Sequence, residues 1–187
     1  MTVAKITKES TVYVLKICAV LLVITMCVAF LLSFVNAVTK DVIAANEAAK
    51  ISEALGGLFP SAAKLEVTKS EGEYSAPVNA FYGVKDGDTL IGYYADVSPV
   101  GFKGAVNLMV GLDTEGKVVG VKIISHGETI GIGTRIEDEE FLGGFVGKEG
   151  ALDGSVDTIS GATYSSKAVI SGVDAALDAY KTMKGGN

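Results

Sequence analysis

Residues 105–124 read AVNLMVGLDTEGKVVGVKII, two apolar, β-branched runs around a turn at residues 113–116. Runs of this kind on either side of a short turn are typical of a β-hairpin. A second pair of runs, at residues 79–84 and 89–97, flanks the Asp-Gly turn at 86–87 in the same way. The two hairpins together predict an antiparallel sheet.

The C-terminal segment, residues 165–184, is predicted to be an amphipathic helix. Its apolar residues include Val169, Val173 and Ala176, which recur at helical spacing and form a stripe that can pack on the sheet. Between the sheet and this helix, residues 125–154 are rich in glycine and lose regular periodicity. Glycine-rich loops of this length beside a sheet are more often functional than structural. The predicted fold class of this part of the chain is α+β.

An uncharged, apolar stretch at residues 17–39 precedes the predicted domain. As an α-helix it would be about 35 Å long, enough to cross a hydrocarbon core of about 30 Å. We therefore predict a single transmembrane helix. The alternative is a cleaved signal peptide with Val35-Asn36-Ala37 near the cleavage site, but the apolar region of a signal peptide is usually only about 7–15 residues long.

Basic residues before the apolar stretch predict the orientation of the chain in the membrane. Lys5, Lys8 and Lys16 stand there against Glu9 alone, and an excess of basic residues is typical of the cytoplasmic side. We expect a protein anchored once in the cell membrane, with its domain on the outer side. The expected order is a cytoplasmic tail (1–16), a transmembrane helix (17–39), a juxtamembrane helix and linker (40–60) and an extracytoplasmic domain (61–187).

The composition disfavours several classes of function. Beyond residue 40, 12 Lys and Arg stand against 21 Asp and Glu, a balance that does not attract nucleic acid. Cys18 and Cys27 both lie in the apolar stretch, so the predicted domain has no disulfide, thiol nucleophile or cysteine-ligated cluster. His126 is the only histidine, and without further nitrogen or sulfur ligands the sequence predicts no metal site.

A run of small and hydroxyl residues, Asp157-Thr-Ile-Ser-Gly-Ala-Thr163, lies directly before the C-terminal helix. The free backbone N–H groups and the dipole at a helix N-terminus favour a phosphate at such a place. Taken alone, the last four residues of the run are equally typical of an ordinary helix cap. If the run binds a phosphate beside Thr163, the residues that we expect to surround it are Ser160, Gly161, Ala162, Ser165 and Lys167.

A second candidate segment, residues 126–135, reads HGETIGIGTR. Its GxG pattern is not a dinucleotide-binding fingerprint, because no parallel βαβ unit surrounds it. The segment is either a solvated loop or a loop that hydrogen-bonds the edge of a planar heterocycle. A hydrolase triad of Ser160, His126 and Asp157 is disfavoured, because no nucleophile-elbow sequence accompanies it. The residues that we assign to the ligand here are Glu128, Thr129, Gly131, Gly133 and Thr134.

The string from Val156 to Val169 resembles the covalent flavin attachment motif of the FMN-binding domain family. The resemblance implies that the oxygen of Thr163 is joined to the phosphate of FMN, and that a separate flavin transferase installs it from FAD. Ile130 and Ile132 stand where the family's usual Glu-Thr-Pro-Gly-Leu-Gly has Pro and Leu. The family's other landmarks are matched at residues 101–104, 109–113 and 128–133.

With a membrane helix at its N-terminus, the chain is similar within that family to the anchored subunits of redox-driven ion pumps. The resemblance implies an electron carrier without catalytic residues of its own, in a complex that couples ferredoxin oxidation and NAD reduction to sodium or proton transport. It also implies the other subunits, the flavin transferase and membrane lipid as partners. The alternative function is a membrane-tethered binding or assembly module that holds a phosphate-bearing ligand reversibly.

Overall fold

The computed structural model describes the backbone of residues 2–70, 72, 74–152 and 154–185, with side chains from residue 11 onward apart from that of residue 44. The chain divides into two compact units, residues 1–48 and 49–187, which are described separately. The side chains of Lys5, Lys8 and Glu9, on which the predicted cytoplasmic tail depends, lie outside the described residues.

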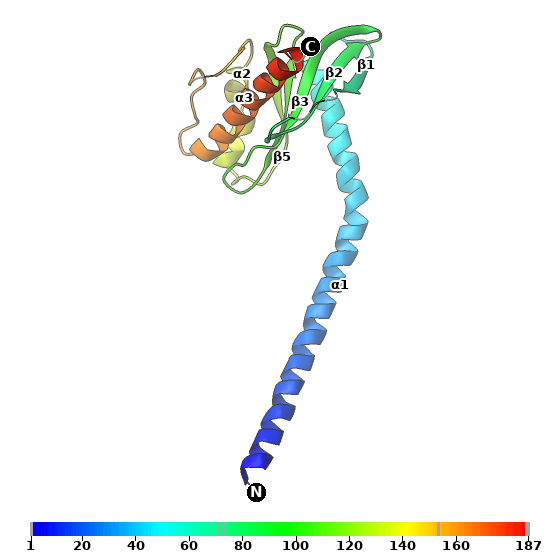
Figure 1. The fold of residues 1–187 in the computed structure, drawn as a ribbon, viewed down its shortest axis with the longest axis vertical. Coiled ribbons are helices and arrows are strands. Elements are labelled where there is room, and N and C mark those ends of the chain that lie inside the picture. Colours follow the sequence, from blue (N-terminus) through cyan, green and yellow to red (C-terminus); the bar gives the residue numbers. More distant parts are fainter. Residues whose placement is uncertain (1, 71, 73, 153, 186–187) are drawn as a thin grey trace. The chain divides into compact units, whose positions relative to one another are not determined.

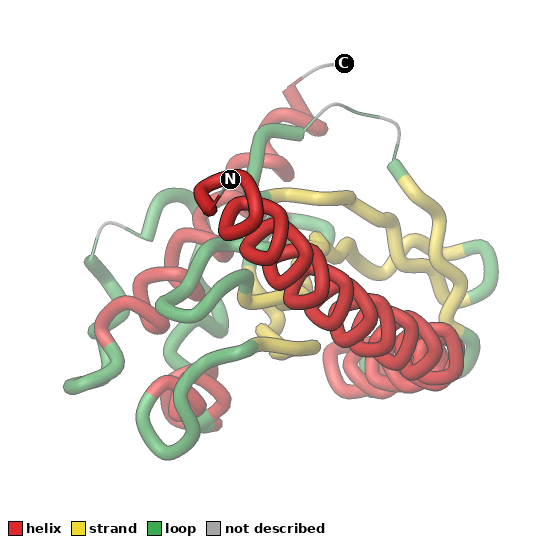
Figure 2. The backbone as a smooth tube through the Cα atoms, turned by 90° about the horizontal axis from the view of Figure 1, so that it is seen from below, coloured by secondary structure: helices red, strands yellow, loops and turns green. Residues whose placement is uncertain are grey.

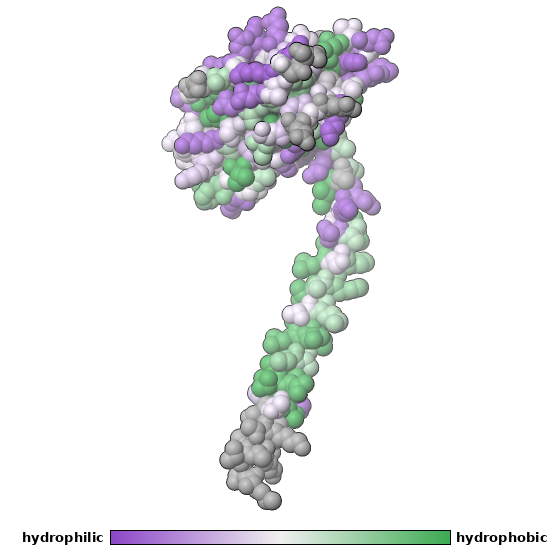
Figure 3. All heavy atoms as spheres, viewed as in Figure 1, coloured by the Kyte–Doolittle hydropathy of each residue, from purple (hydrophilic) through white to green (hydrophobic). Residues whose placement is uncertain are grey.

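The first unit is formed by α1, a helix that spans Thr2–Leu58 and continues into the second unit. It is the one helix among the described residues that is long and apolar enough to cross a membrane. On the face that Figure 3 shows, hydrophobic side chains cover much of this helix, whereas the domain is largely hydrophilic. The predicted transmembrane and juxtamembrane segments are thus one continuous helix, which ends just beyond Gly56-Gly57 and before Pro60.

The second unit contains a five-stranded antiparallel sheet in which the strands follow their order in the sequence (Figure 1). The two predicted hairpins are confirmed as β2–β3 and β4–β5, since each pair is joined antiparallel through its turn. One short edge strand, β1, was not predicted separately. The strands are β1 (Leu65–Lys69), β2 (Val78–Asp86), β3 (Thr89–Val97), β4 (Val106–Leu112) and β5 (Val118–His126).

One face of the sheet is covered by α3, which spans Thr163–Gly185 (Figure 1). Val169 and Val173 of this helix are fully buried in one cluster with Phe81 and Leu108 of the sheet. The apolar stripe predicted from helical spacing is therefore confirmed as the buried face of α3. Transfer of this apolar surface out of water is the main stabilising contribution to the domain.

The other face of the sheet packs against the last turns of α1. Leu58 and Phe59 are buried there in a second cluster with Tyr94 and Met109. The helix comes close to the strands where they lack side chains: a Cβ atom on Gly120 would lie only 2.7 Å from Leu58. The sheet is therefore covered on both faces, by α3 on one and by the end of α1 on the other.

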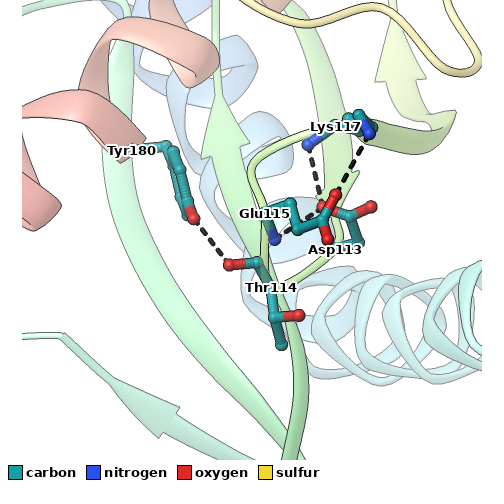
Figure 4. Close-up of polar contacts among 5 residues, drawn as sticks. All are labelled: Asp113, Thr114, Glu115, Lys117 and Tyr180. Carbon is teal, nitrogen blue, oxygen red and sulfur yellow. Dashed lines mark hydrogen bonds and ion pairs between the residues drawn. The ribbon is translucent and has the colours of Figure 1, made fainter.

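The β4–β5 turn is fixed to the C-terminal half of α3 (Figure 4). The Oδ1 atom of Asp113 accepts the backbone N–H groups of Glu115 at 2.8 Å and Lys117 at 2.9 Å, which closes the turn. The hydroxyl of Tyr180 donates to the carbonyl oxygen of Thr114 at 2.7 Å. This contact joins the C-terminal half of α3 to the turn, and the N-terminus of the helix lies at the opposite end of the strands.

Loops dominate the connection from β5 to α3 (Figure 2). It contains a short 3-10 helix, η1 (Gly133–Glu137), and the single-turn helix α2 (Glu139–Gly143), which the sequence did not predict because residues 125–154 lack regular periodicity. Phe141 and Phe145 pack against each other with ring centroids 5.3 Å apart and join the cluster beneath α3. The loops on either side of these helices are thereby held close to the first turn of α3.

Candidate functional site

A pocket of about 410 Å³ opens at the N-terminus of α3. Three segments meet there: the loop between β3 and β4, the loop after β5, and the end of the attachment-motif run with the first turn of α3. The volume lies within the range of about 300–1,000 Å³ that is common for small-molecule sites. The lining residues are Phe102, Glu128, Thr129, Ile132, Gly133, Gly161, Ala162, Thr163, Tyr164 and Ser165.

The first turn of α3 presents its hydroxyl groups in two ways. Thr163, the first residue of the helix, is exposed and lines the pocket. Ser166 is fully buried; its Oγ atom donates to the carbonyl oxygen of Ala162 at 3.0 Å and accepts the N–H of Ile159 at 3.1 Å. The motif run is thus folded back onto the helix, and Thr163 is left beside N–H groups that have no partner within the helix.

Glu128 is a buried carboxylate at the base of the pocket, only 5% exposed. Its Oε2 atom accepts a hydrogen bond from the hydroxyl of Ser165, and its Oε1 atom accepts the N–H of Lys103 at 3.0 Å. Burial alone would raise the pKa of Glu128. Four interactions outweigh this effect and lower the pKa below its ordinary value: the hydrogen bond from Ser165, the hydrogen bonds from the backbone amides of Lys103 and Phe102, and the electrostatic effect of His126.

His126, at the end of β5, fixes the start of the loop that carries Glu128. Its Nδ1 atom accepts the N–H of Glu128 at 3.2 Å, and its Nε2 atom lies 3.0 Å from Oε1 of Glu137. Because Nδ1 is an acceptor, this network assigns the imidazole proton to Nε2, where it is donated to Glu137. Among the described residues, no group of three or more His, Cys, Asp or Glu side chains could hold a metal ion.

Four of the residues that the sequence assigns to a ligand do not line this pocket. Ser160 lines a neighbouring pocket of about 380 Å³, and its carbonyl oxygen accepts a bond from Arg135 at 3.2 Å. The hydroxyl of Thr134 accepts the N–H of Gly131 at 2.9 Å and so closes a turn within the loop. Lys167 is exposed on α3. The assigned residues that the pocket brings together are Glu128, Thr129, Gly133, Gly161, Ala162, Thr163 and Ser165.

Three apolar wall residues were not assigned from the sequence: Phe102, Ile132 and Tyr164. The rings of Phe102 and Tyr164 lie 6.2 Å apart between centroids and are 66% and 72% exposed. Large apolar side chains on a surface offer flat contact area to a planar ligand. Helical or strand periodicity cannot reveal these three residues, since it identifies buried faces. The signal that could have found two of them is the family resemblance, because Phe102 lies in the matched landmark at 101–104 and Tyr164 lies in the attachment motif.

Comparison with known proteins identifies the family of the chain. It is 32% identical, over 180 residues, to the G subunit of the ion-translocating oxidoreductase complex of Methanosarcina acetivorans, a match that covers 91% of this chain and 96% of the relative. The chain belongs to this family of G subunits. It is also 32% identical over 115 residues to the G subunit of the proton-translocating ferredoxin:NAD(+) oxidoreductase complex of Clostridium ljungdahlii, covering 57% and 62% of the two chains. The G subunit of the ion-translocating complex of Aliivibrio fischeri is 35% identical over 99 residues, 46% and 47% of the two chains.

Residues 101–178 of this family member match the FMN-binding domain. All residues that line the pocket fall within that range, so the pocket belongs to the matched domain. The predicted FMN-binding domain and its α+β class are thereby confirmed. The donor set also fits a flavin phosphate: an exposed hydroxyl and a helix N-terminus lie beside exposed aromatic rings, which suit the two ends of such a molecule.

Proposed function

We propose that the chain is a membrane-anchored flavoprotein electron carrier, one subunit of a redox-driven ion-translocating ferredoxin:NAD oxidoreductase of the Rnf type. We further propose that it carries FMN as a phosphoester of Thr163. The observation that supports this best is the place of Thr163, an exposed hydroxyl at the start of α3, in the pocket of the matched FMN-binding domain. When bound, the flavin would supply reversible transfer of one or two electrons.

The pocket residues would hold the two ends of FMN by different interactions. At the phosphate end, the N–H groups in the first turn of α3 favour negative charge. Lys167 lies four residues after Thr163, on the same face of the helix, and can offset that charge. At the other end, Phe102, Ile132 and Tyr164 offer an apolar wall. The hydroxyl of Thr129, which also lines the pocket, can hydrogen-bond a polar edge of the ring.

Attachment requires a donor, which we propose is FAD brought by a flavin transferase. The Oγ1 atom of Thr163 forms a bond to the phosphorus of the FMN half, the bond to the AMP half breaks, and the hydroxyl proton is released. AMP therefore leaves, and no electron changes hands. A covalent tether keeps the redox group on a domain from which a free flavin would diffuse away.

The chain is also proposed to lie in the cell membrane in one orientation. The apolar part of α1 would span the bilayer, with the N-terminus in the cytoplasm and the domain outside. The other subunits of the complex, lipid around α1 and the flavin transferase are its proposed partners. The isolated chain would carry electrons, and translocation of ions would belong to the assembled complex.

The test is to produce the full chain with and without a flavin transferase. We expect a fluorescent band after denaturing electrophoresis and an added intact mass of FMN less one water, in the co-produced sample only. Thr163→Ala should lose both signals, whereas Thr163→Ser, which keeps a hydroxyl, should retain them. Thr89→Ala is the matched threonine control, since Thr89 is exposed at the start of β3, outside the attachment motif and the pocket, and it should label fully.

The outcomes separate the function from the site. If the co-produced wild-type chain carries no added mass, the electron-carrier proposal fails, and a module that binds a phosphate-bearing ligand reversibly becomes the better account. If Thr163→Ala still carries covalent FMN, the carrier stands and only the assignment of Thr163 is wrong. Peptide mapping of the labelled chain would then locate the attachment residue.

A further inference from the structure

Glu128 joins the three segments that form the pocket. Its carboxylate accepts the Ser165 hydroxyl on α3 and the backbone N–H of Lys103 in the β3–β4 loop, while its own backbone belongs to the loop after β5. We propose that Glu128 is a positioning residue for flavin attachment: it holds these three walls together so that Thr163 faces the pocket. This inference rests on the proposed attachment of FMN to Thr163.

The chain packs closely around this carboxylate from two sides. A Cβ atom on Gly101 would lie 2.6 Å from Oε1 of Glu128, and one on Gly133 would lie 2.8 Å from Cβ of Glu128. Both distances are too short for any side chain, so only glycine is compatible with this packing. The two glycines therefore allow the loops to close on Glu128, which makes the buried contact a built part of the pocket.

The hydrogen bonds of Glu128 show that it acts through other residues. Both carboxylate oxygens have protein donors, and the side chain is almost wholly buried. Since the hydroxyl proton of Ser165 is donated to Glu128, it is not available to a phosphate oxygen. On the first turn of α3, Thr163 then remains the exposed aliphatic hydroxyl in the pocket, and Ser165 belongs to the support beneath it.

The network continues from Glu128 to the surface through His126. The imidazole accepts the N–H of Glu128 with one nitrogen and contacts Glu137 with the other. The backbone N–H of Glu128 is thus held by His126, and its carboxylate is held by Ser165 and the N–H of Lys103. A side chain held at both ends keeps a defined geometry, which an attachment reaction requires of the groups around its nucleophile.

The test measures the initial rate at which a flavin transferase loads FMN from FAD onto the purified full-length apo-chain, as a function of chain concentration. Glu128→Ala removes all the carboxylate contacts. Glu128→Gln keeps them in modified form, because its amide oxygen can accept the loop N–H groups while its NH₂ donates to Ser165. Asp86→Ala is the matched control: Asp86 accepts the N–H groups of Ala63 and Lys64 at 3.2 and 2.8 Å and does not line the pocket.

We expect Glu128→Ala to lower kcat for loading at least tenfold at a temperature where circular dichroism shows it folded. Glu128→Gln and Asp86→Ala should load within threefold of the wild-type chain. A purely structural loss would reduce the fraction of competent chain, which raises the apparent KM and leaves kcat unchanged. A fall in kcat that Glu128→Gln restores is therefore specific to positioning.

Several results would overturn the inference. One is a folded Glu128→Ala chain that loads at the wild-type rate, and another is an equal loss in Asp86→Ala. If Glu128→Ala does not fold, Glu128→Asp decides, because its shorter side chain cannot reach Ser165 and the loop amides together; loading as fast as wild type would refute positioning. Failure of the wild-type chain to load would instead refute the proposed function itself.

Discussion

The core beneath α3 and the pocket at the helix N-terminus distribute polar and apolar side chains in opposite ways. In the core, apolar residues such as Phe81 and Val173 are fully buried. At the pocket, Glu128 and Ser165 are buried, while the rings of Phe102 and Tyr164 lie exposed. The core buries apolar side chains, as folding in water requires, whereas the pocket buries polar side chains and exposes aromatic ones. Such an inversion indicates a surface arranged for a ligand, and the stability of the domain should depend far more on the core.

The largest difference should come from removing one phenyl ring in each region. Phe81→Ala deletes a fully buried ring, and the lost transfer free energy together with the cavity should lower the free energy of unfolding by about 3–5 kcal/mol. Phe102→Ala deletes a ring that is 66% exposed and should change it by less than about 0.5 kcal/mol. Urea unfolding of the apo-chain, followed by circular dichroism, measures both.

In the chain that carries FMN, Phe102→Ala should affect the flavin more than Phe81→Ala does. Phe102→Ala should shift the absorption or fluorescence of bound FMN, because the ring lines the pocket, whereas any folded Phe81→Ala chain should keep the wild-type spectrum. If Phe102→Ala were as destabilising as Phe81→Ala, the separation between a stabilising core and a ligand-facing rim would be wrong.

A smaller difference is expected for alanine at two glycines with positive φ. Gly116 in the β4–β5 turn has φ of 91°, and an added Cβ would meet the ring of Tyr180 at 2.2 Å. Gly161, in the motif run, has φ of 83° but no atom within 4 Å of an added Cβ. Gly161→Ala should therefore lower the free energy of unfolding only by the strain of a left-handed backbone, about 1–2 kcal/mol.

Gly116→Ala should cost more than this, because it adds a steric clash of about 1–3 kcal/mol to the same backbone strain. Thermal melting of the two apo-variants gives the comparison. Equal losses would mean that Tyr180 moves away freely and that its contact with the turn, shown in Figure 4, contributes little to the position of α3.

The regular parts of the domain could be predicted from the sequence because their signals are local. The apolar, β-branched runs of β2 to β5 with their turn residues, and the helical spacing of Val169 and Val173, each lie within a few neighbouring positions. The short strand β1 carried no comparable signal, since four of its five residues are exposed. The transmembrane and juxtamembrane helices were predicted as separate segments, and α1 joins them in one continuous helix.

The pocket could be predicted only in part, because its contacts join segments that are distant in sequence. Thr163 and its neighbours were identified from one run of residues and from its resemblance to a motif. The bond between Ser165 and Glu128 spans 37 positions, and no local pattern pairs them. Ser165 was therefore assigned to the phosphate, whereas the structure places its hydroxyl on Glu128, and the exposed Phe102 and Tyr164 were left unassigned.

The smallest expected effect is the dependence of stability on pH, where the two regions should again differ. The pKa of Glu128 is lowered from its ordinary value of 4.5, despite burial, by the bonds from Ser165 and the loop amides. Its contribution to stability is therefore complete above about pH 4.5 and is lost as the pH falls through the lower folded value. Glu128→Gln should flatten this acid loss in urea midpoints measured between pH 3 and 7.

Asp96, on the sheet face that carries Tyr94, should show the opposite sign. Burial raises its pKa above 3.8, and the bond from Asn79 offsets this only in part. The folded chain then holds this proton more tightly than the unfolded chain, so the contribution of Asp96 is present below about pH 3.8 and is lost as the pH rises through the higher folded value. Relative to the wild-type chain, Asp96→Asn should thus give a larger gain in the free energy of unfolding at pH 7 than at pH 4. Glu128→Gln should instead give a larger loss at pH 7 than at pH 4. If both variants moved the urea midpoint in the same direction across this range, the hydrogen bonds to Glu128 would not outweigh its burial, and the distinction between the two carboxylates would fail.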